Sequence, residues 1–419
     1  MPHSASTQPV AITGLGAIGA PGRGVAAIDL ALQQGRDGLG TLDLWQTELA
    51  AHYPVGQYRG DLAADLALVP GFEATPAHLA RLSRSDQLAL VATAEAAAQA
   101  GLSPADFART GAGAYLGLSV CGTLASEAEY TSAVMAAKQG SRKRPPPAAL
   151  FTHEGASSLD ALARYFKLNG PTLSFMTACS SGANAIGLAA ERIARGQASV
   201  MLAGGADSLS RIAYYGFHSL QVVSPDGPRP FDRDRKGMSV GEGAGVVVLE
   251  SLAHARARGA RVLGLVSGYG HSCDAHHLTA PHPQGAGAVA AMRAALQSAG
   301  LQAADIGYIN AHGTATLDND RTEARAIAAL FGENSVPVSS IKRFFGHTLA
   351  AAGAIEAVVC VRALQQQVMP QNLGLRQALD DARLDLVTMP RQAKGMRHVL
   401  SNSFGFGGNN AALVFSTGD

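Results

Sequence analysis

The chain is poor in charged and aromatic residues for its length. Only 16% of its 419 residues are Asp, Glu, Lys or Arg, the formal net charge is +1, and aromatic residues make up 5%. Because a nucleic-acid-binding domain is expected to be strongly basic, this balance argues against nucleic acid as a partner. Hydrophobic residues make up 47%, and glycine occurs 48 times. This composition predicts a large, well-buried body with a core of small aliphatic side chains and many turns.

Cysteine and long apolar segments are also scarce. The four cysteines, at positions 121, 179, 273 and 360, form no C-x-x-C pair, which argues against a disulfide scaffold and favours a reducing compartment. The first ten residues lack the basic-then-apolar order of a signal peptide, and no apolar run approaches about 18 residues. We therefore expect a cytoplasmic protein without a membrane segment.

Strand-like and helix-like segments alternate along the chain, which predicts α/β layers with buried sheets. Short apolar or β-branched runs predict strands at 9–13, 113–118, 200–204, 243–249, 262–269, 306–310, 336–339 and 411–415. Apolar residues at helical spacing predict helices at 79–100, 158–166, 183–195, 286–299, 320–330 and 350–364.

Cys179 lies where a predicted buried strand, residues 172–177, turns into the predicted helix 183–195. Its neighbours Ala178, Ser180, Ser181 and Gly182 are small, so they permit a sharp turn and the approach of a substrate. A thiol at a helix N-terminus feels the positive end of the helix dipole, which favours the nucleophilic thiolate. The alternative is a buried, inert cysteine, since free cysteine is among the most buried residue types.

Two histidines and a lysine occur at similar transitions. His312 follows the predicted strand 306–310, while Lys342 and His347 lie between the strand 336–339 and the helix 350–364. Each of these residues alone is more often structural than catalytic. Three strand-to-helix transitions that all carry reactive side chains predict convergence on Cys179.

Two other patterns are weaker. The run Gly14–Gly19 fits G-x-G-x-x-G after a strand, but Pro21 and Gly22 interrupt the helix start that a dinucleotide site requires. The histidines at 271, 276, 277 and 282 fit no standard zinc spacing and lie in a Gly/Pro-rich loop. We therefore predict neither a nicotinamide site nor a metal site.

The chain resembles the β-ketoacyl-acyl carrier protein synthases of the elongating type I/II group. The matching motifs are TACSSG at 177–182, NAHGTAT at 310–316, K-x4-H at 342–347 and NSFGFGGNN at 402–410, with further matches at 10–19 and 230–250. The resemblance implies an α/β thiolase fold, which is a duplicated, five-layered α-β-α-β-α architecture. It places Cys179 in an N-terminal half, residues 1–255, and His312, Lys342 and His347 in a C-terminal half, residues 256–419.

The same resemblance implies a chemistry for these residues. Cys179 is expected to carry the acyl chain as a thioester, while His312 and His347 assist decarboxylation of malonyl and stabilise the enolate. Two neutral imidazoles suit that task, because each donates one hydrogen bond in a dry site. Lys342, paired with Glu323, is expected to order the histidine region. No metal or resident cofactor is implied, since phosphopantetheine arrives on the acyl carrier protein.

Further residues are implied to bind or gate the substrate. The backbone N–H groups of Cys179 and Phe406 are expected to form an oxyanion hole, with Phe406 as a gate on the acyl pocket. Asp320 is a supporting residue. The expected substrate contacts are Thr314, Thr316, Phe404, His277 and Thr279.

The acidic acyl carrier protein needs a basic docking surface, because complementary charge speeds encounter. Arg81 and Arg84 on the predicted helix 79–100 are the favoured candidates by resemblance, and the run Arg142, Lys143 and Arg144 is the second. The resemblance also implies a homodimer, or a heterodimer with a homologous chain-length subunit, in which residues 144–151 reach the partner's acyl pocket.

The sequence departs from the family pattern at Ala350, where glycine is usual, and near Leu317, where proline is common. These changes predict a local adjustment of the loop that binds the pantetheine arm, and not a loss of activity. Two alternatives are weighed: a non-catalytic chain-length subunit, disfavoured by Cys179, and a CoA-dependent thiolase or starter synthase, disfavoured by His347. Fatty-acid, polyketide and aryl-polyene synthesis remain open.

Overall fold

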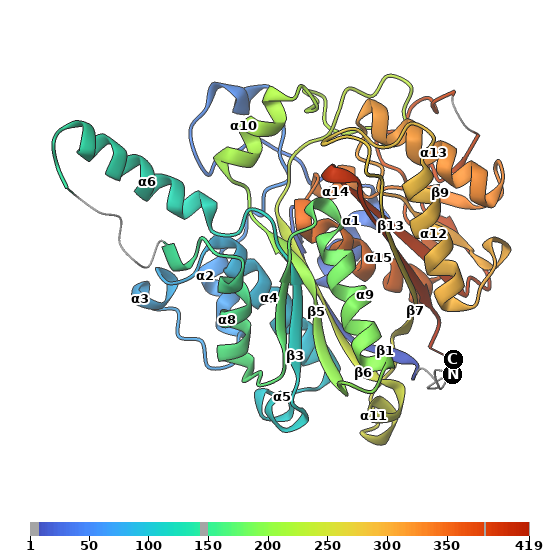
Figure 1. The fold of residues 1–419 in the computed structure, drawn as a ribbon, viewed down its shortest axis with the longest axis horizontal. Coiled ribbons are helices and arrows are strands. Elements are labelled where there is room, and N and C mark those ends of the chain that lie inside the picture. Colours follow the sequence, from blue (N-terminus) through green and yellow to red (C-terminus); the bar gives the residue numbers. More distant parts are fainter. Residues whose placement is uncertain (1–7, 143–149, 381–382, 419) are drawn as a thin grey trace.

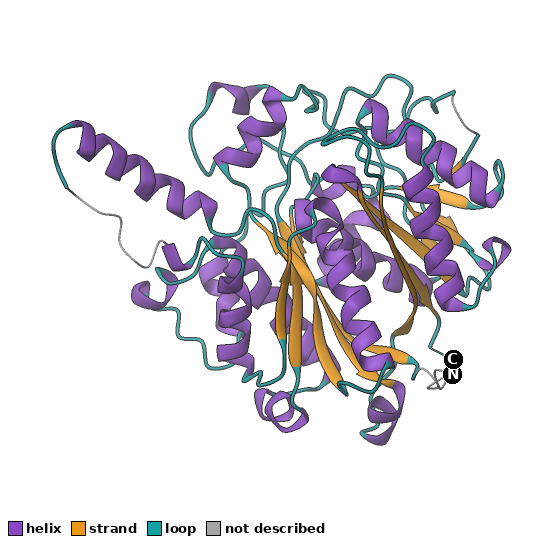
Figure 2. Ribbon diagram, in the orientation of Figure 1, coloured by secondary structure: helices purple, strands orange, loops and turns teal. Residues whose placement is uncertain are grey.

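The computed structural model describes residues 8–142, 150–380 and 383–418. Its main strands form two five-stranded sheets with the same internal order (Figure 2). The two are joined into one twelve-stranded sheet, which also includes β2 and β11, because β1 and β7 pair over Val10–Ile12 and Gly264–Val266. The first sheet has the order β4-β3-β5-β6-β1 and consists of β1 (Val10–Gly19), β3 (Gly113–Gly117), β4 (Thr172–Phe175), β5 (Val200–Asp207) and β6 (Gly243–Ser251). The second has the order β9-β8-β13-β14-β7 and consists of β7 (Gly264–Cys273), β8 (Tyr308–Asn310), β9 (Pro337–Ser339), β13 (His398–Gly405) and β14 (Asn409–Ser416).

Strand direction repeats as well. In each sheet the first three strands of the order run parallel, the fourth runs opposite to them, and the fifth pairs antiparallel with the fourth. The expected duplication is therefore visible in the topology. The remaining strands are short: β2 (Gly22–Arg23), β10 (Val368–Met369), β11 (Asp385–Leu386) and β12 (Arg391–Gln392).

Helices form the other three layers (Figure 1). The central helices α9 (Ser181–Ala194) and α15 (Ala352–Gln366) contact strands of both sheets. The first sheet is covered by α4 (Arg84–Ala100) and α8 (Ala156–Phe166), and the second by α12 (Ala286–Ala299) with α13 (Leu317–Phe331) beside it. The shorter helices are α1 (Val25–Gln34), α2 (Leu62–Asp65), α3 (Pro76–Leu79), α5 (Pro104–Thr110), α10 (Arg211–Ser219), α11 (Leu252–Ala257) and α14 (Lys342–Phe345).

Glycine allows the central helices to approach closely. A Cβ atom at Gly182 of α9 would lie 2.7 Å from the Ala350 carbonyl oxygen, and one at Gly353 of α15 would lie 2.9 Å from the Ala183 Cβ. The segment Leu349–Gln366 is long and apolar enough to span a membrane, with mean hydropathy 1.3, although no such run was predicted from the sequence. Because 83% of it is buried between the sheets, it is the core helix of this fold.

Two local predictions are wrong. The predicted helix 79–100 is broken, since Ser83 caps a new helix, α4, with a reciprocal bond to Asp86. The segment 172–177 was expected to be buried, but β4 is the edge strand of its sheet, and the Leu173 side chain is 48% exposed.

One long helix was not predicted. Helix α6 (Thr123–Lys138) projects from the body with no buried residue (Figure 1). Tyr130 and Met135 on it are exposed apolar side chains.

Candidate active site

Cys179 lies on a strained turn between β4 and α9. The preceding residue, Ala178, has a positive φ of 53°, a conformation that L-residues with a side chain rarely adopt. The chain is held from the other side by Gly405, where a Cβ atom would lie 3.1 Å from the Cys179 nitrogen. This turn places the thiol at the N-terminus of α9, as predicted.

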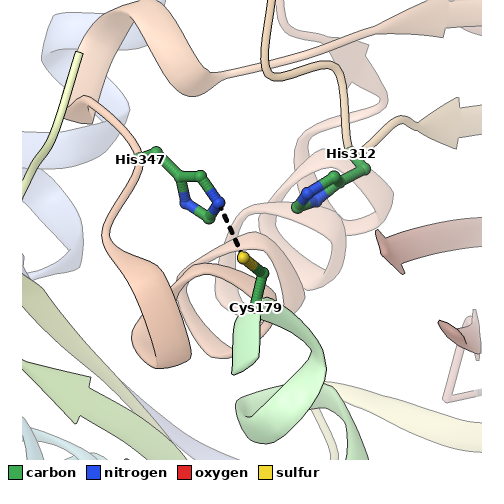
Figure 3. A group of neighbouring side chains, drawn as sticks. All are labelled: Cys179, His312 and His347. Atoms are coloured by element: carbon green, nitrogen blue, oxygen red, sulfur yellow. Dashed lines mark hydrogen bonds between the residues drawn. The ribbon is translucent and has the colours of Figure 1, made fainter. Parts of the chain in front are cut away.

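The structure brings both predicted histidines to Cys179 (Figure 3). His347 Nε2 lies 3.0 Å from the Cys179 Sγ, and the two imidazole rings are 5.3 Å apart and nearly perpendicular. The Sγ and one nitrogen of each ring lie within 4.8 Å of one another. All three residues are buried, so the reactive groups face one another away from bulk water.

The hydrogen bonds of His347 determine which nitrogen carries its proton. The Leu349 N–H donates to His347 Nδ1 at 3.3 Å. A neutral imidazole that accepts at Nδ1 carries its hydrogen on Nε2. His347 therefore directs an N–H, and not a lone pair, toward the Cys179 sulfur.

Burial keeps these groups neutral. Burial and the positive charge of Lys342 hold the pKa of His347 well below its usual range, and the pKa of His312 is lowered in the same way. Burial also raises the pKa of the Cys179 thiol to about 11, which outweighs the opposing effects of Lys342 and of two backbone N–H groups. Desolvation of the thiol therefore opposes the helix dipole, which on its own favours the thiolate.

Lys342 does not pair with Glu323 as expected. Its Nζ forms a buried ion pair with Glu356 of α15. Glu323 instead accepts the backbone N–H groups of His312 and Gly313, each at 2.8 Å, and thereby fixes the His312 loop. Burial raises the pKa of Glu323 to about 7. Glu323 and Glu356 both support the histidine region, but only Glu356 pairs with the positive charge of Lys342.

A cavity of about 320 Å³ leads from the surface to Cys179 and both histidines. Its walls include Thr279, Thr314, Thr316, Phe404 and Phe406 from the predicted substrate contacts and gate. His277 is not among its lining residues in the described part of the chain. Its Nδ1 accepts the N–H groups of Thr279 and Ala280 and so stabilises a surface turn.

Asp320 supports this cavity indirectly. Its carboxylate accepts the N–H groups of Phe231 and Ala315, and Ala315 is the positive-φ residue between the two cavity threonines. Asp320 therefore holds the threonine loop in place without lining the cavity.

Comparison with known proteins assigns this arrangement. Residues 7–255 match the family "Beta-ketoacyl synthase, N-terminal domain", and residues 263–376 match "Beta-ketoacyl synthase, C-terminal domain". The chain belongs to the beta-ketoacyl synthase family. It is a ketosynthase of fatty-acid or polyketide synthesis, an enzyme that transfers acyl groups and forms carbon–carbon bonds.

Similar proteins match nearly the whole ketosynthase chain. Nodulation protein E of Rhizobium meliloti (strain 1021) is 38% identical and covers 97% of this chain and 98% of its own. The 3-oxoacyl-[acyl-carrier-protein] synthase 2 of Synechocystis sp. is 36% identical, with 97% of each chain covered. Among solved structures, the ishigamide ketosynthase/chain length factor superposes with a TM-score of 0.91 at 31% identity, over 99% of this chain and 100% of that one.

The ketosynthase positions a second pair of donors at Cys179. The backbone N–H groups of Phe406 and of Cys179 itself act on the Sγ and oppose the rise in the pKa of the thiol. The Phe406 ring lies 5.9 Å from that of Phe217, which also lines the cavity. The Phe406 side chain therefore borders the route to Cys179.

The predicted docking arginines differ in their surroundings. Arg84 forms a bidentate ion pair with the fully buried Glu242, with bonds of 2.6 and 2.8 Å, so it is a structural residue and not a docking residue. Arg81 and Arg142 are exposed, whereas Lys143 and Arg144 lie outside the described residues.

We expect the alkylation rate of Cys179 by iodoacetamide to rise throughout pH 7 to 10, by about tenfold per pH unit, without levelling off. The thiolate is the reacting form, and its fraction grows in this way below a pKa of about 11. Mass spectrometry of the peptide that contains Cys179 measures the rate. A plateau near pH 8.5, the ordinary cysteine value, would contradict the effect of burial.

Proposed function

We propose that Cys179 carries the growing acyl chain as a thioester and that the ketosynthase extends it with malonyl bound to an acyl carrier protein. The observation that carries this proposal is the buried set of one thiol and two neutral imidazoles at the end of the cavity. In the first half-reaction the sulfur attacks the incoming thioester carbonyl. A carbon–sulfur bond forms to Cys179, the bond to pantetheine breaks, and the departing pantetheine sulfur takes up the thiol proton.

The second half-reaction uses the histidines. Malonyl loses carbon dioxide, and the electron pair of the broken carbon–carbon bond becomes an enolate. Its oxygen accepts hydrogen bonds from His312 and His347, and its carbon attacks the Cys179 thioester. The N–H groups of Cys179 and Phe406 stabilise the tetrahedral oxyanion. Its collapse breaks the carbon–sulfur bond, and the Cys179 thiolate that leaves takes up a proton from solvent. The enolate oxygen needs hydrogen-bond donors. The Nε2–H tautomer of His347 supplies such a donor on the side that faces Cys179.

Mass spectrometry tests this function against its two alternatives. Incubation with acyl-acyl carrier protein is expected to add one acyl group at Cys179. Absence of an adduct would indicate a chain-length subunit without catalysis. Acylation of Cys179 from acyl-CoA as fast as from acyl-acyl carrier protein would indicate a thiolase or starter synthase.

We propose that catalysis requires no metal and no cofactor other than the carrier's phosphopantetheine, and that the enzyme is cytoplasmic. The reaction above balances without a redox or Lewis-acid step, and the absence of a C-x-x-C pair suits a reducing compartment. Activity retained after exhaustive chelation tests the first point, and cell fractionation tests the second.

We propose that the acyl carrier protein docks at Arg81. Arg81 shares a shallow cavity with His78, Arg164 and Asp160. The two arginines outnumber the one carboxylate, which gives this face a positive charge for an acidic partner. The name of the Synechocystis relative includes such a carrier. Charge reversal at Arg81 is expected to raise KM for the carrier-bound substrate, and an unchanged KM would move the docking site elsewhere.

The ketosynthase is expected to be a dimer, either with itself or with a chain-length subunit. An edge strand with an exposed apolar side chain, such as β4, invites pairing with another chain, and the solved relative combines a ketosynthase with a chain length factor. Phe151, at the end of the segment predicted to reach the partner, is exposed; residues 143–149 of this region lie outside the described chain.

Sedimentation of two matched variants tests the dimer. Leu173→Glu on β4 is expected to dissociate it, whereas Leu30→Glu on α1 is not, although the two leucines are 48% and 49% exposed. An active wild-type monomer at micromolar concentration would refute the prediction.

The Phe406 gate is tested at Gly407, which has a positive φ of 77°. In Gly407→Ala the added Cβ would meet only the Asn409 side chain, at 3.1 Å, so its effect comes from the backbone, which alanine restricts. We expect slower acylation of Cys179 in stopped-flow measurements, because the Phe406 ring must move to admit the chain. An unchanged rate in a folded dimer would exclude this gate.

A further inference from the structure

Asp207, at the end of β5, is a fully buried carboxylate that the steps above do not use. It accepts hydrogen bonds from two other segments. Oδ1 accepts the N–H groups of Ser119 at 3.1 Å, Val120 at 2.9 Å and Cys121 at 3.3 Å. Oδ2 accepts the Ser119 hydroxyl at 2.5 Å and the Ala350 N–H at 2.9 Å. One side chain thus ties the loop after β3 to the turn that follows His347.

Both of these segments contain a strained residue. Cys121 has a φ of 48° and Leu349 has a φ of 53°, values that cost free energy for residues with a side chain and persist only when the surroundings fix them. The bond from Ala350 fixes the peptide group that follows Leu349. The peptide group that precedes Leu349 supplies the N–H that donates to His347 Nδ1.

The backbone of His347 is anchored separately. Its N–H donates to the Ser239 carbonyl at 2.7 Å, and its carbonyl accepts from Gly241 at 2.9 Å. These bonds place the Cα atom but leave the ring free to rotate and to exchange tautomers. The contact that selects the tautomer is the Leu349 N–H, and its direction depends on the strained turn that Asp207 holds.

We propose that Asp207 is a positioning residue that keeps the proton of His347 on Nε2, directed at Cys179 and at the enolate. The inference rests on the proposed function for its catalytic consequence, but the tautomer itself is a property of the resting protein. An asparagine at this position has one oxygen to accept bonds and an NH₂ group that repels backbone donors. Asp207→Asn therefore releases part of the five-bond set, and the turn that holds Leu349 relaxes.

The tautomer is read by ¹⁵N NMR of histidine-labelled enzyme, with the His347 signals assigned by their loss in His347→Gln. Wild type is expected to show the Nε2–H form alone, and Asp207→Asn a mixture of both neutral forms. Release of carbon dioxide from malonyl-carrier is expected to fall by ~10-fold or more, the scale on which orientation of a catalytic imidazole matters. Acylation of Cys179 is expected to change much less.

Asp232→Asn is the matched control. Asp232 is also fully buried and accepts backbone N–H groups, from Arg376 at 2.7 Å and Gln377 at 3.0 Å, but these donors lie outside the turn that follows His347. It is expected to leave the His347 spectrum unchanged. If Asp207→Asn does not fold, an amide-to-ester replacement at Ala350 removes only the one donor and is expected to give the same mixture.

The outcomes separate the two hypotheses. A pure Nε2–H form in Asp207→Asn, or in the ester variant, would overturn the role of Asp207. Failure of the wild type to form an acyl-enzyme or release carbon dioxide would overturn the proposed function, while the tautomer result would still decide whether Asp207 orients His347.

Discussion

Cys179→Ala is expected to give a folded protein that forms no acyl thioester and no carbon–carbon bond. Alanine keeps the Cβ atom and loses only the sulfur, so the strained turn and the start of α9 are expected to be retained. No other described side chain that lines the cavity offers a thiol. The loss is therefore expected to be complete within detection when intact mass and product formation are measured.

The matched control is Cys273→Ala. Cys273 is exposed at the end of β7, and its sulfur lies 3.7 Å from the Gly407 carbonyl oxygen, so it is near the Phe406 loop but does not line the cavity. This variant is expected to acylate normally. Elongation by Cys179→Ala at close to the wild-type rate would show that the nucleophile lies elsewhere.

His312→Ala and His347→Ala are each expected to lower carbon dioxide release from malonyl-carrier by ~10²–10³, the usual effect of removing one oxyanion donor. Acylation of Cys179 is expected to persist, because the N–H groups of Cys179 and Phe406 remain in place. Separate assays with radiolabelled acyl and malonyl carriers measure the two steps.

A conservative change sharpens this test. In His347→Gln the side-chain amide nitrogen occupies about the position of Nε2 and still donates, so part of the decarboxylation is expected to return. The control His276→Ala removes an exposed histidine that does not line the cavity. Loss of acylation with normal decarboxylation would refute this division of labour.

Much of the site could be predicted from local sequence. Cys179 and His312 each follow a strand and precede a helix, and His347 lies between the short helix α14 and the long helix α15. Connecting segments of this kind often carry functional side chains. The partner of Lys342 could not be predicted, because Glu323 and Glu356 both lie on helices beside the site. The choice between them depends on how α13 and α15 pack, which no local pattern encodes.

Burial explains two other differences. Strand β13 was missed because Ser401, Asn402 and Ser403 interrupt its apolar pattern, yet all three are buried beside the site. The prediction that the thiolate is favoured was based on the dipole of α9 alone. The desolvation that raises the pKa of the Cys179 thiol depends on packing around it. Asp207 and Leu349 carry no motif, and their importance depends on hydrogen bonds between segments distant in sequence.

The close approach of α9 and α15 at Gly182 and Gly353 has a consequence for how the enzyme could be divided. Cys179 comes from the segment that leads into α9, whereas both histidines come from the second sheet's half of the chain. Neither half alone contains Cys179 together with both histidines. Under the proposed mechanism, two separately expressed fragments would therefore regain activity only by reassociating through the packed central helices. Activity would therefore measure how well the two halves associate. A bulky side chain at Gly182 or Gly353 is expected to keep the halves apart while each sheet stays folded.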